Sequence, residues 1–369
     1  MRSLLKIFSG FIFTAILICP SALRAQMPGG PDGVVDSAMR GAVIDGVIKE
    51  LNDNYIFPET AKKMETDLRS RQGAKEYDSI TSARQFAEKL TSDLQSVSHD
   101  KHLRVRFSAD VLPVRQDADK PTDAERADET RYVKFMNSGF EQIERMPGNI
   151  GYIRFNAFVD PEIGTDTVTS AMNFVSNTDA LIFDLRGNGG GDPAMVRLIC
   201  SYLFGDKPVH LNDLFFRKGS RTEEFWTTPT VAGKKFPDKD IYVLTSSRTF
   251  SGAEEFTYNL KNLKRATIVG ETTGGGANPG DVFRLNDHFG AFIPTGRAIN
   301  PITKTNWEGT GVEPDVKVPK EQALKTAYLM ALNKALANAK DEGLKQAIRR
   351  VIDQNQKDLD EMKKTQKTN

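Results

Sequence analysis

Cysteine and histidine are both scarce in this chain, and neither sign of charge predominates. The 369 residues include two cysteines, too few for a disulfide framework, and four histidines. Lysine and arginine number 50 against 49 aspartates and glutamates, so the charge favours neither nucleic acid nor anionic lipid as a partner. The length exceeds what one compact core usually carries, and 39% hydrophobic residues can form a substantial core. We therefore expect a folded protein with more than one domain.

The start of the chain has the pattern of an export signal. Residues 1–25 combine a basic start, an apolar run that ends at Pro20, and small residues before Gln26. The run is too short to span a bilayer comfortably, although an uncleaved anchor is the alternative. The pattern predicts a signal peptide and a periplasmic or extracellular protein, without stable membrane insertion after cleavage. Cleavage would remove Cys19 and leave Cys200, which its apolar helical surroundings mark as a buried residue rather than a nucleophile.

Hydrophobic periodicity divides the remaining chain into four regions. Residues 26–108 show mainly helical spacing and predict a small N-terminal helical domain. Residues 109–135 are polar, charged and punctuated by proline, which favours a linker or loop. Strands alternate with helices across 136–319, and this alternation predicts an α/β domain with a largely parallel sheet. Residues 320–369 form an alanine-rich helical tail of mixed charge.

A strand, a turn and a helix over residues 240–263 place one serine in a chemically useful position. Ser251 would lie at the start of the helix, where free N–H groups and the helix dipole favour a developing oxyanion. Gly252 would let a substrate approach the backbone closely. The alternative is that Ser251 is only a helix N-cap.

A glycine-rich turn over residues 184–192 also follows an apolar strand and precedes a helix. A dinucleotide fingerprint needs glycine where this chain has Asp192, and a phosphate loop needs a Gly-Lys-Ser/Thr ending that is missing. The remaining functional use is an oxyanion hole formed by the amide of Gly189 or Gly190 together with that of Gly252. A plain tight turn is the alternative.

The scarcity of histidine limits which residue could act as a base for a serine nucleophile. His99 and His102 lie at a junction between a helix and a strand, where loop residues can reach a site on another domain. His210 and His288 fit surface positions better. A solvated histidine without a catalytic role is the alternative at each of these positions.

A histidine base would need a carboxylate to fix its tautomer. Glu271, Glu308 and Glu313 all lie near glycine-rich loops at strand ends. Their positions in the sequence do not choose among them, and each could be a solvated surface acid.

Four motifs in this order resemble the tail-specific (C-terminal processing) serine peptidase family. They are DLRGNGGG, TSSRTFSGAEEF, VGETTGGGANPG and NWEGTGVEPDV. The resemblance is to the branch similar to interphotoreceptor retinoid-binding protein and the tricorn core, and covers residues 149–318, with NYIFPE at 54–59 and DKHLRV at 100–105 extending it. It implies a crotonase-like (ClpP-like) α/β catalytic domain with Ser251 as nucleophile.

The resemblance also implies which base serves this serine. In the processing-protease branch a lysine lies in the loop occupied here by ETTGGGANPG, which contains no lysine. The other branch uses a histidine and a glutamate, here His102 and Glu308, with His99 as the reserve base. Some relatives place a serine directly before the base, whereas Lys101 precedes His102 here, so a fourth relay member stays open. The short polar stretch after His102 leaves no room for a PDZ domain.

The resemblance therefore implies an exported serine endopeptidase that needs no metal or cofactor and acts on peptides or unfolded proteins. Two alternatives remain open at the level of sequence. One is an inactive carrier of apolar ligands on the same fold, and the other is an acyl-CoA enzyme of the wider crotonase type. A homo-oligomer is compatible with all three interpretations.

Overall fold

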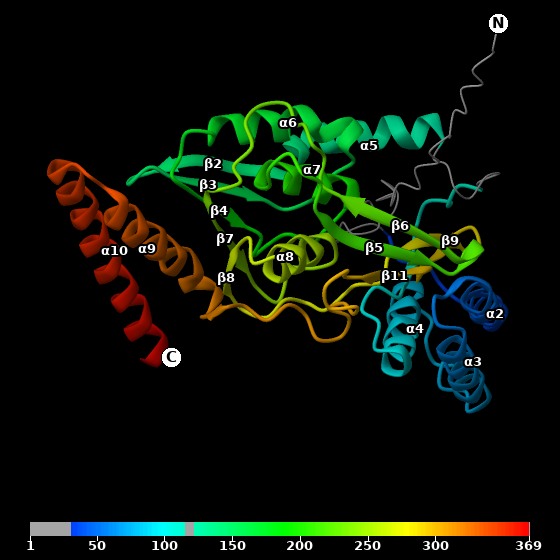
Figure 1. Ribbon diagram of the computed structural model, residues 1–369. Coiled ribbons are helices and arrows are strands. Elements are labelled where there is room, and N and C mark those ends of the chain that lie inside the picture. Colours follow the sequence, from blue (N-terminus) through cyan, green and yellow to red (C-terminus); the bar gives the residue numbers. More distant parts are fainter. Residues whose placement is uncertain (1–30, 115–121, 369) are drawn as a thin grey trace, which may run out of the picture.

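A computed structural model of the chain describes residues 31–114 and 122–368 (Figure 1). The predicted signal peptide, residues 1–25, lies outside the described residues. Across those two ranges, no helix is both long enough and apolar enough to cross a bilayer.

Three helices form the N-terminal region, as the periodicity predicts. They are α2 (Ser37–Asn54), α3 (Pro58–Gly73) and α4 (Ala83–Ser98). The Asp36 side chain caps α2, and Ser82 caps α4 by accepting from the Gln85 N–H. Their inward faces form one hydrophobic core, which includes Val43, Val47, Leu51, Met64, Leu68, Phe86, Leu90 and Leu94.

A small antiparallel sheet joins this helical region to the rest of the molecule. Strand β1 (Arg104–Phe107) pairs with β10 (Phe289–Pro294), which pairs in turn with β9 (Gly280–Arg284). Val105 and Phe289 are buried in the same core as the three helices. The residues just before β1 are therefore fixed against a segment far along the chain.

The larger domain is built on a six-stranded sheet with the order β12-β8-β7-β4-β3-β2. Strand β2 is antiparallel to β3, and the other pairings are parallel. This confirms the predicted α/β fold. The strands are β2 (Phe140–Met146), β3 (Ile150–Phe155), β4 (Ala180–Asp184), β7 (Asp240–Thr245), β8 (Thr267–Gly270) and β12 (Val316–Lys317).

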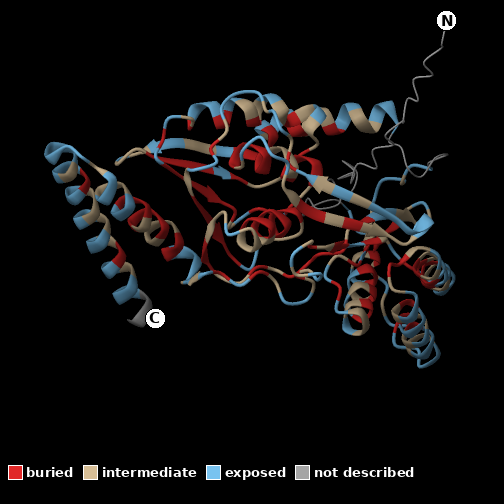
Figure 2. Ribbon diagram, viewed as in Figure 1, coloured by how far each residue is buried: buried red, intermediate tan, exposed pale blue. Residues whose placement is uncertain are grey.

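Helices cover both faces of this sheet, and its central strands β3, β4, β7 and β8 are largely buried (Figure 2). Leu181 and Val243 pack in one core with the helices of the first face, while Ile182 and Leu244 pack in a second core on the other. The first face carries α6 (Pro161–Phe174), α7 (Pro193–Leu203) and α8 (Gly252–Asn262), and the second carries α9 (Lys320–Asn338) and α10 (Glu342–Thr368).

A second small sheet has the order β11-β5-β6 and is antiparallel throughout. It consists of β5 (His210–Phe216), β6 (Arg221–Trp226) and β11 (Gly296–Ile299). Cys200, on α7, is fully buried, in agreement with its apolar sequence surroundings.

The segment that the sequence assigns to a linker or loop, residues 109–135, contains helix α5 (Asp123–Phe135). Thr122 accepts from the Glu125 N–H, and the Glu125 carboxylate accepts from the Thr122 N–H. This reciprocal capping box stabilises the first turn despite the polar composition of the segment.

Candidate active site

Ser251 occupies an unusual backbone conformation at the N-terminus of α8. Its φ and ψ angles are 53° and −123°, which non-glycine residues rarely adopt. The chain enters from β7 (Asp240–Thr245) and turns sharply into the helix. A serine on such a strand-turn-helix bend is presented outward at the edge of the sheet, and strained backbone of this kind clusters at functional sites.

The turn that carries Ser251 is joined to the glycine-rich turn by hydrogen bonds. The Thr249 hydroxyl donates to the Leu185 carbonyl at 2.7 Å. The Phe250 N–H donates to the Asn188 carbonyl at 3.1 Å. Because β4 and β7 are adjacent and parallel, their carboxyl ends meet at one edge of the sheet. The two motifs that the sequence singles out are therefore neighbours.

Glu254, which is absent from the site residues that the sequence predicts, holds the third glycine-rich loop in place. Its carboxylate accepts from the N–H groups of Ser251 (2.9 Å), Gly275 (2.6 Å) and Gly276 (2.8 Å), and from the Thr273 hydroxyl. Burial raises the pKa of this carboxyl to about 6. The sequence signal is the Ser-x-x-Glu spacing of a capping box at residues 251–254.

Replacing Glu254 with glutamine is expected to destabilise the protein. Each of the two carboxyl oxygens accepts two hydrogen bonds. The NH₂ group of glutamine would therefore face N–H or O–H donors in either orientation of the amide. We expect Glu254→Gln to cost about 1–3 kcal/mol in the free energy of unfolding, measured by urea denaturation. The control is Glu88→Gln, the same chemical change at an exposed position on α4. Equal stability of the two variants would contradict this role.

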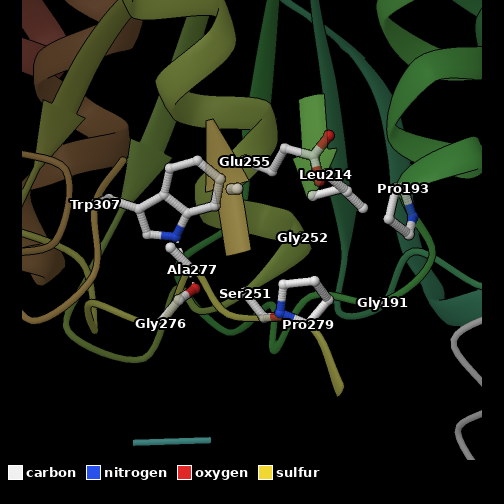
Figure 3. A pocket seen from close by; sticks show the side chains of 11 residues that line it. Gly191, Pro193, Leu214, Ser251, Gly252, Glu255, Gly276, Ala277, Pro279 and Trp307 are labelled. Carbon is white, nitrogen blue, oxygen red and sulfur yellow. Dashed lines mark hydrogen bonds between the residues drawn. The ribbon is translucent and has the colours of Figure 1, made fainter. Parts of the chain in front are cut away.

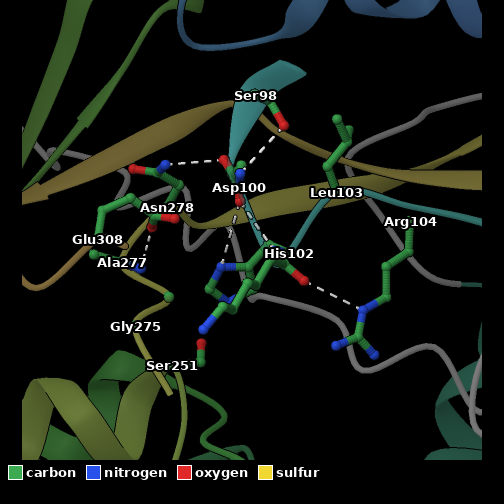
Figure 4. A network of polar contacts seen from close by, with 12 residues as sticks. Ser98, Asp100, His102, Leu103, Arg104, Ser251, Gly275, Ala277, Asn278 and Glu308 are labelled. Carbon is green, nitrogen blue, oxygen red and sulfur yellow. Dashed lines mark hydrogen bonds and ion pairs between the residues drawn. The ribbon is translucent and has the colours of Figure 1, made fainter. Parts of the chain in front are cut away.

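His102 lies beside Ser251 because β1 pairs with β10. Its ring packs on Phe250, with ring centroids 4.6 Å apart, and on Phe292 at 5.9 Å. Figure 4 shows the Ser251 side chain directed toward the His102 ring. Both ring nitrogens are buried and have no hydrogen-bond partner within the described part of the chain. Burial lowers the pKa of His102 to about 3, which keeps the imidazole neutral.

Asp100 lies on the other side of the His102 ring, although the sequence does not single it out. Its Oδ1 is 4.0 Å from His102 Nδ1 and accepts from the His102 backbone N–H at 3.0 Å. Its Oδ2 accepts from the Tyr55 hydroxyl at 3.2 Å and from the Asn278 amide at 2.9 Å. These donors fix the carboxylate in the buried site.

Glu308 completes this cluster. Its Oε2 accepts from the Ala277 N–H at 2.5 Å, whereas its Oε1 is buried without a hydrogen-bond partner in the ranges described. Single polar atoms of Asp100, His102 and Glu308 lie within 4.8 Å of one another, a spacing that could also hold a metal ion. Burial, and then the negative charge of Asp100, raise the pKa of Glu308 to about 8.

The other three histidines do not join this cluster. His99 is exposed and ends α4 with a left-handed backbone, φ 59°. His210 pairs with Asp213 at 2.6 Å, and His288 contacts the Ser108 carbonyl through Nδ1 at 3.0 Å.

The other two candidate acids lie elsewhere as well. Glu271 accepts from the Lys320 N–H at 3.0 Å, at the start of α9. Glu313 is exposed.

Two of the amides predicted for an oxyanion hole are engaged within the protein. The Gly189 N–H donates to the Asn156 carbonyl at 3.2 Å, and the Gly190 N–H donates to Asn188 Oδ1 at 2.8 Å. The N–H groups of Gly191 and Gly252 donate no hydrogen bond to any described residue. Side-chain hydrogen bonds of this kind cannot be inferred from a run of glycines.

The two turns approach so closely that glycine is required. A Cβ atom at Gly190 would lie 2.6 Å from the Gly252 nitrogen, and Gly190 has a φ of +98°. The glycine-rich turn therefore lies directly against the backbone nitrogen of Gly252, next to Ser251.

A cleft lies beside Ser251 (Figure 3). Its walls are largely apolar and come from six different parts of the chain. Besides Ser251 and four small residues (Gly191, Gly252, Gly276 and Ala277), it is lined by Pro193, Leu214, Glu255, Pro279, Ala298 and Trp307.

Comparison with known proteins gives two matches to family descriptions. Residues 149–318 match peptidase family S41, and residues 37–137 match the N-terminal domain of peptidase S41 in eukaryotic IRBP. Together the two matches cover most of the chain and include Ser251, His102 and Glu308.

Among curated proteins, the chain is similar to carboxyl-terminal processing enzymes. It is 29% identical over 174 residues to the chloroplastic carboxyl-terminal-processing peptidase 2 of Arabidopsis thaliana. The aligned residues make up 46% of this chain and 32% of that protein. It is 26% identical over 196 residues to the carboxy-terminal-processing protease of Bartonella bacilliformis, covering 50% and 42%. The chain thus matches less than half the length of these relatives.

Among solved structures, a candidate peptidase from Parabacteroides merdae has a similar fold. The TM-score is 0.55 at 16% sequence identity, covering 82% of this chain and 98% of the other. At this identity the likeness concerns the fold.

Proposed function

Because the chain belongs to peptidase family S41, we propose that it is an exported serine-type endopeptidase acting on peptides or unfolded proteins. The observation that carries the proposal is the position of Ser251, strained at the N-terminus of α8 beside the ring of His102, whose two nitrogens have no hydrogen-bond partner in the described chain. Export rests on the pattern of residues 1–25.

In the proposed reaction, Ser251 Oγ attacks the carbonyl carbon of the scissile bond. His102 removes the serine proton and returns it to the leaving amine. Its low pKa keeps the ring in the neutral, proton-accepting form. Glu308, through the Oε1 that has no partner among the described residues, accepts from His102 Nδ1–H and stabilises the imidazolium that forms at this step.

The oxyanion of the tetrahedral intermediate needs backbone donors. We assign the Gly252 N–H as the first, because it follows the nucleophile at the positive end of the α8 dipole. The Gly191 N–H is the second, because Gly189 and Gly190 already donate to Asn156 and Asn188.

Ser251→Ala tests this function directly. We expect a fluorophosphonate probe to label the wild-type protein and not Ser251→Ala, and peptide hydrolysis to fall by about 10³-fold or more in the variant. Ser92→Ala, an exposed serine on α4, is the control and should be labelled normally. EDTA should leave hydrolysis unchanged if Asp100, His102 and Glu308 hold no metal.

Two outcomes would overturn the proposal. Folded wild-type protein that resists the probe and matches Ser251→Ala on peptides would favour an inactive carrier. Tight binding of coenzyme A without peptide hydrolysis would favour an acyl-CoA enzyme.

A further inference from the structure

Glu255 is a buried acid in the cleft beside Ser251 that the proposed mechanism does not use. It lies on the first turn of α8, and only 4% of its surface is exposed. Its Oε1 has no hydrogen-bond partner within residues 31–114 and 122–368. Because a buried polar atom normally finds a partner, this oxygen points to a missing ligand.

The surroundings of Glu255 are polar but contain no paired cation. The amides of Asn212, on β5, and Asn259, on α8, lie beside it and oppose the rise in its pKa. Even so, Asn212 Nδ2 and Oδ1 and Asn259 Nδ2 are buried without partners in the described chain. Asp192 adds a second nearby carboxyl. Arg197 lies near enough to Asp192 for its charge to lower the pKa of that acid, but neither Asp192 nor Glu255 is in an ion pair within the described residues.

The cleft between Ser251 and this acid has apolar walls. Leu214, Trp307 and Pro279 are among the residues that line it. Figure 3 shows the Glu255 carboxyl at the end of the cleft away from Ser251 and Pro279. Residues four apart on a helix, such as Ser251 and Glu255, are separated by about 6 Å along its axis. That is about the reach of a side chain with four methylene groups.

We propose that Glu255 is a specificity-determining residue, and that the cleft receives a lysine side chain from the substrate residue that supplies the scissile carbonyl. The methylene groups would pack between the apolar walls, and the ammonium would donate to the free Glu255 Oε1. This proposal rests on the proposed function, because it requires Ser251 to be the nucleophile.

A cation is a better partner for Glu255 than an apolar side chain, because it can form an ion pair with the carboxylate. Burial raises the pKa of Glu255 to about 8, and the charge of Asp192 contributes to the increase. An entering ammonium would lower that pKa, so the carboxyl would release its proton to solvent and form a buried ion pair. The apolar end of a leucine or norleucine would leave the carboxyl and the asparagine amides without partners.

Matched peptides test the proposal. Fluorogenic substrates would differ only in the residue before the scissile bond, which is lysine in one and its uncharged analogue norleucine in the other. We expect the wild-type kcat/KM to favour lysine by about tenfold or more. Glu255→Gln should bring the ratio close to one, whereas Glu88→Gln, the exposed control, should keep the wild-type ratio. Glu255→Asp should retain a preference for lysine over norleucine.

Fluorophosphonate labelling of Ser251 in each variant separates the two proposals. Labelled proteins that cleave peptides with the same ratio in wild type and Glu255→Gln would overturn the role of Glu255 and leave the peptidase intact. A wild-type preference for norleucine over lysine would also overturn the proposed role of Glu255. Absence of both labelling and cleavage in the wild type would overturn the peptidase function itself.

Discussion

Replacing His102 with alanine is expected to lower kcat/KM for peptide hydrolysis by about 10⁴-fold or more. His102 is the one histidine placed beside Ser251 among the residues that the structure describes, and its ring nitrogens have no other partner there. Without it, the serine hydroxyl has no base to accept its proton. Fluorophosphonate labelling of Ser251 should slow in parallel, because that reaction uses the same activated hydroxyl.

His99 is the matched control for this experiment. It is exposed and has a left-handed backbone, so asparagine, which tolerates that conformation, is the suitable replacement. We expect His99→Asn to keep activity close to that of the wild type. Loss of activity in His99→Asn, with His102→Ala still active, would show that His99 and not His102 is the catalytic base.

The position of His102 shows what the sequence could and could not predict. Strand and helix patterns predict the α/β domain, because periodicity is a local property. The family resemblance selects His102 and Glu308 among four histidines and many acids. Their meeting depends on the pairing of β1 with β10, between segments nearly two hundred residues apart, for which the local pattern carries no signal.

The residues that sequence did not identify have contacts that only the tertiary structure creates. Asp100 matters because Tyr55 and Asn278 donate to it from distant segments. Glu255 differs from a solvated helix residue because it is buried beside Asn212 of β5, a segment distant in the sequence. The polar composition of residues 109–135 predicts a linker or loop, but the segment contains helix α5. The Thr-x-x-Glu spacing that begins at Thr122 is the sequence signal for the start of this helix.

The activity of the wild-type protein is expected to rise as pH increases through about 8. The raised pKa of Glu308 leaves this carboxyl largely protonated at neutral pH. Only the ionised form can stabilise the imidazolium that develops on His102, so kcat/KM should follow its ionisation. Glu308→Gln should be at least about tenfold less active at pH 9 and should lack the rise. A rise that survives in Glu308→Gln would assign it to another group.

Asp100 provides an independent check on the same titration. Its negative charge is one cause of the raised pKa of Glu308, so Asp100→Asn should move the midpoint of the rise below pH 8. A midpoint that stays in place or moves upward would show that the two acids do not interact as the distances indicate.

Stability gives a readout of this titration that does not depend on catalysis. The folded pKa of Glu308, about 8, lies above its ordinary value of 4.5. The protonated carboxyl therefore contributes its full stability below pH 4.5, and the contribution is lost as pH rises from 4.5 to 8. Glutamine stays neutral throughout, so wild type should lose stability to urea relative to Glu308→Gln between pH 5 and pH 9. Parallel curves would mean that the carboxyl ionises normally in the folded protein, and the alkaline rise in activity would then belong to a different group.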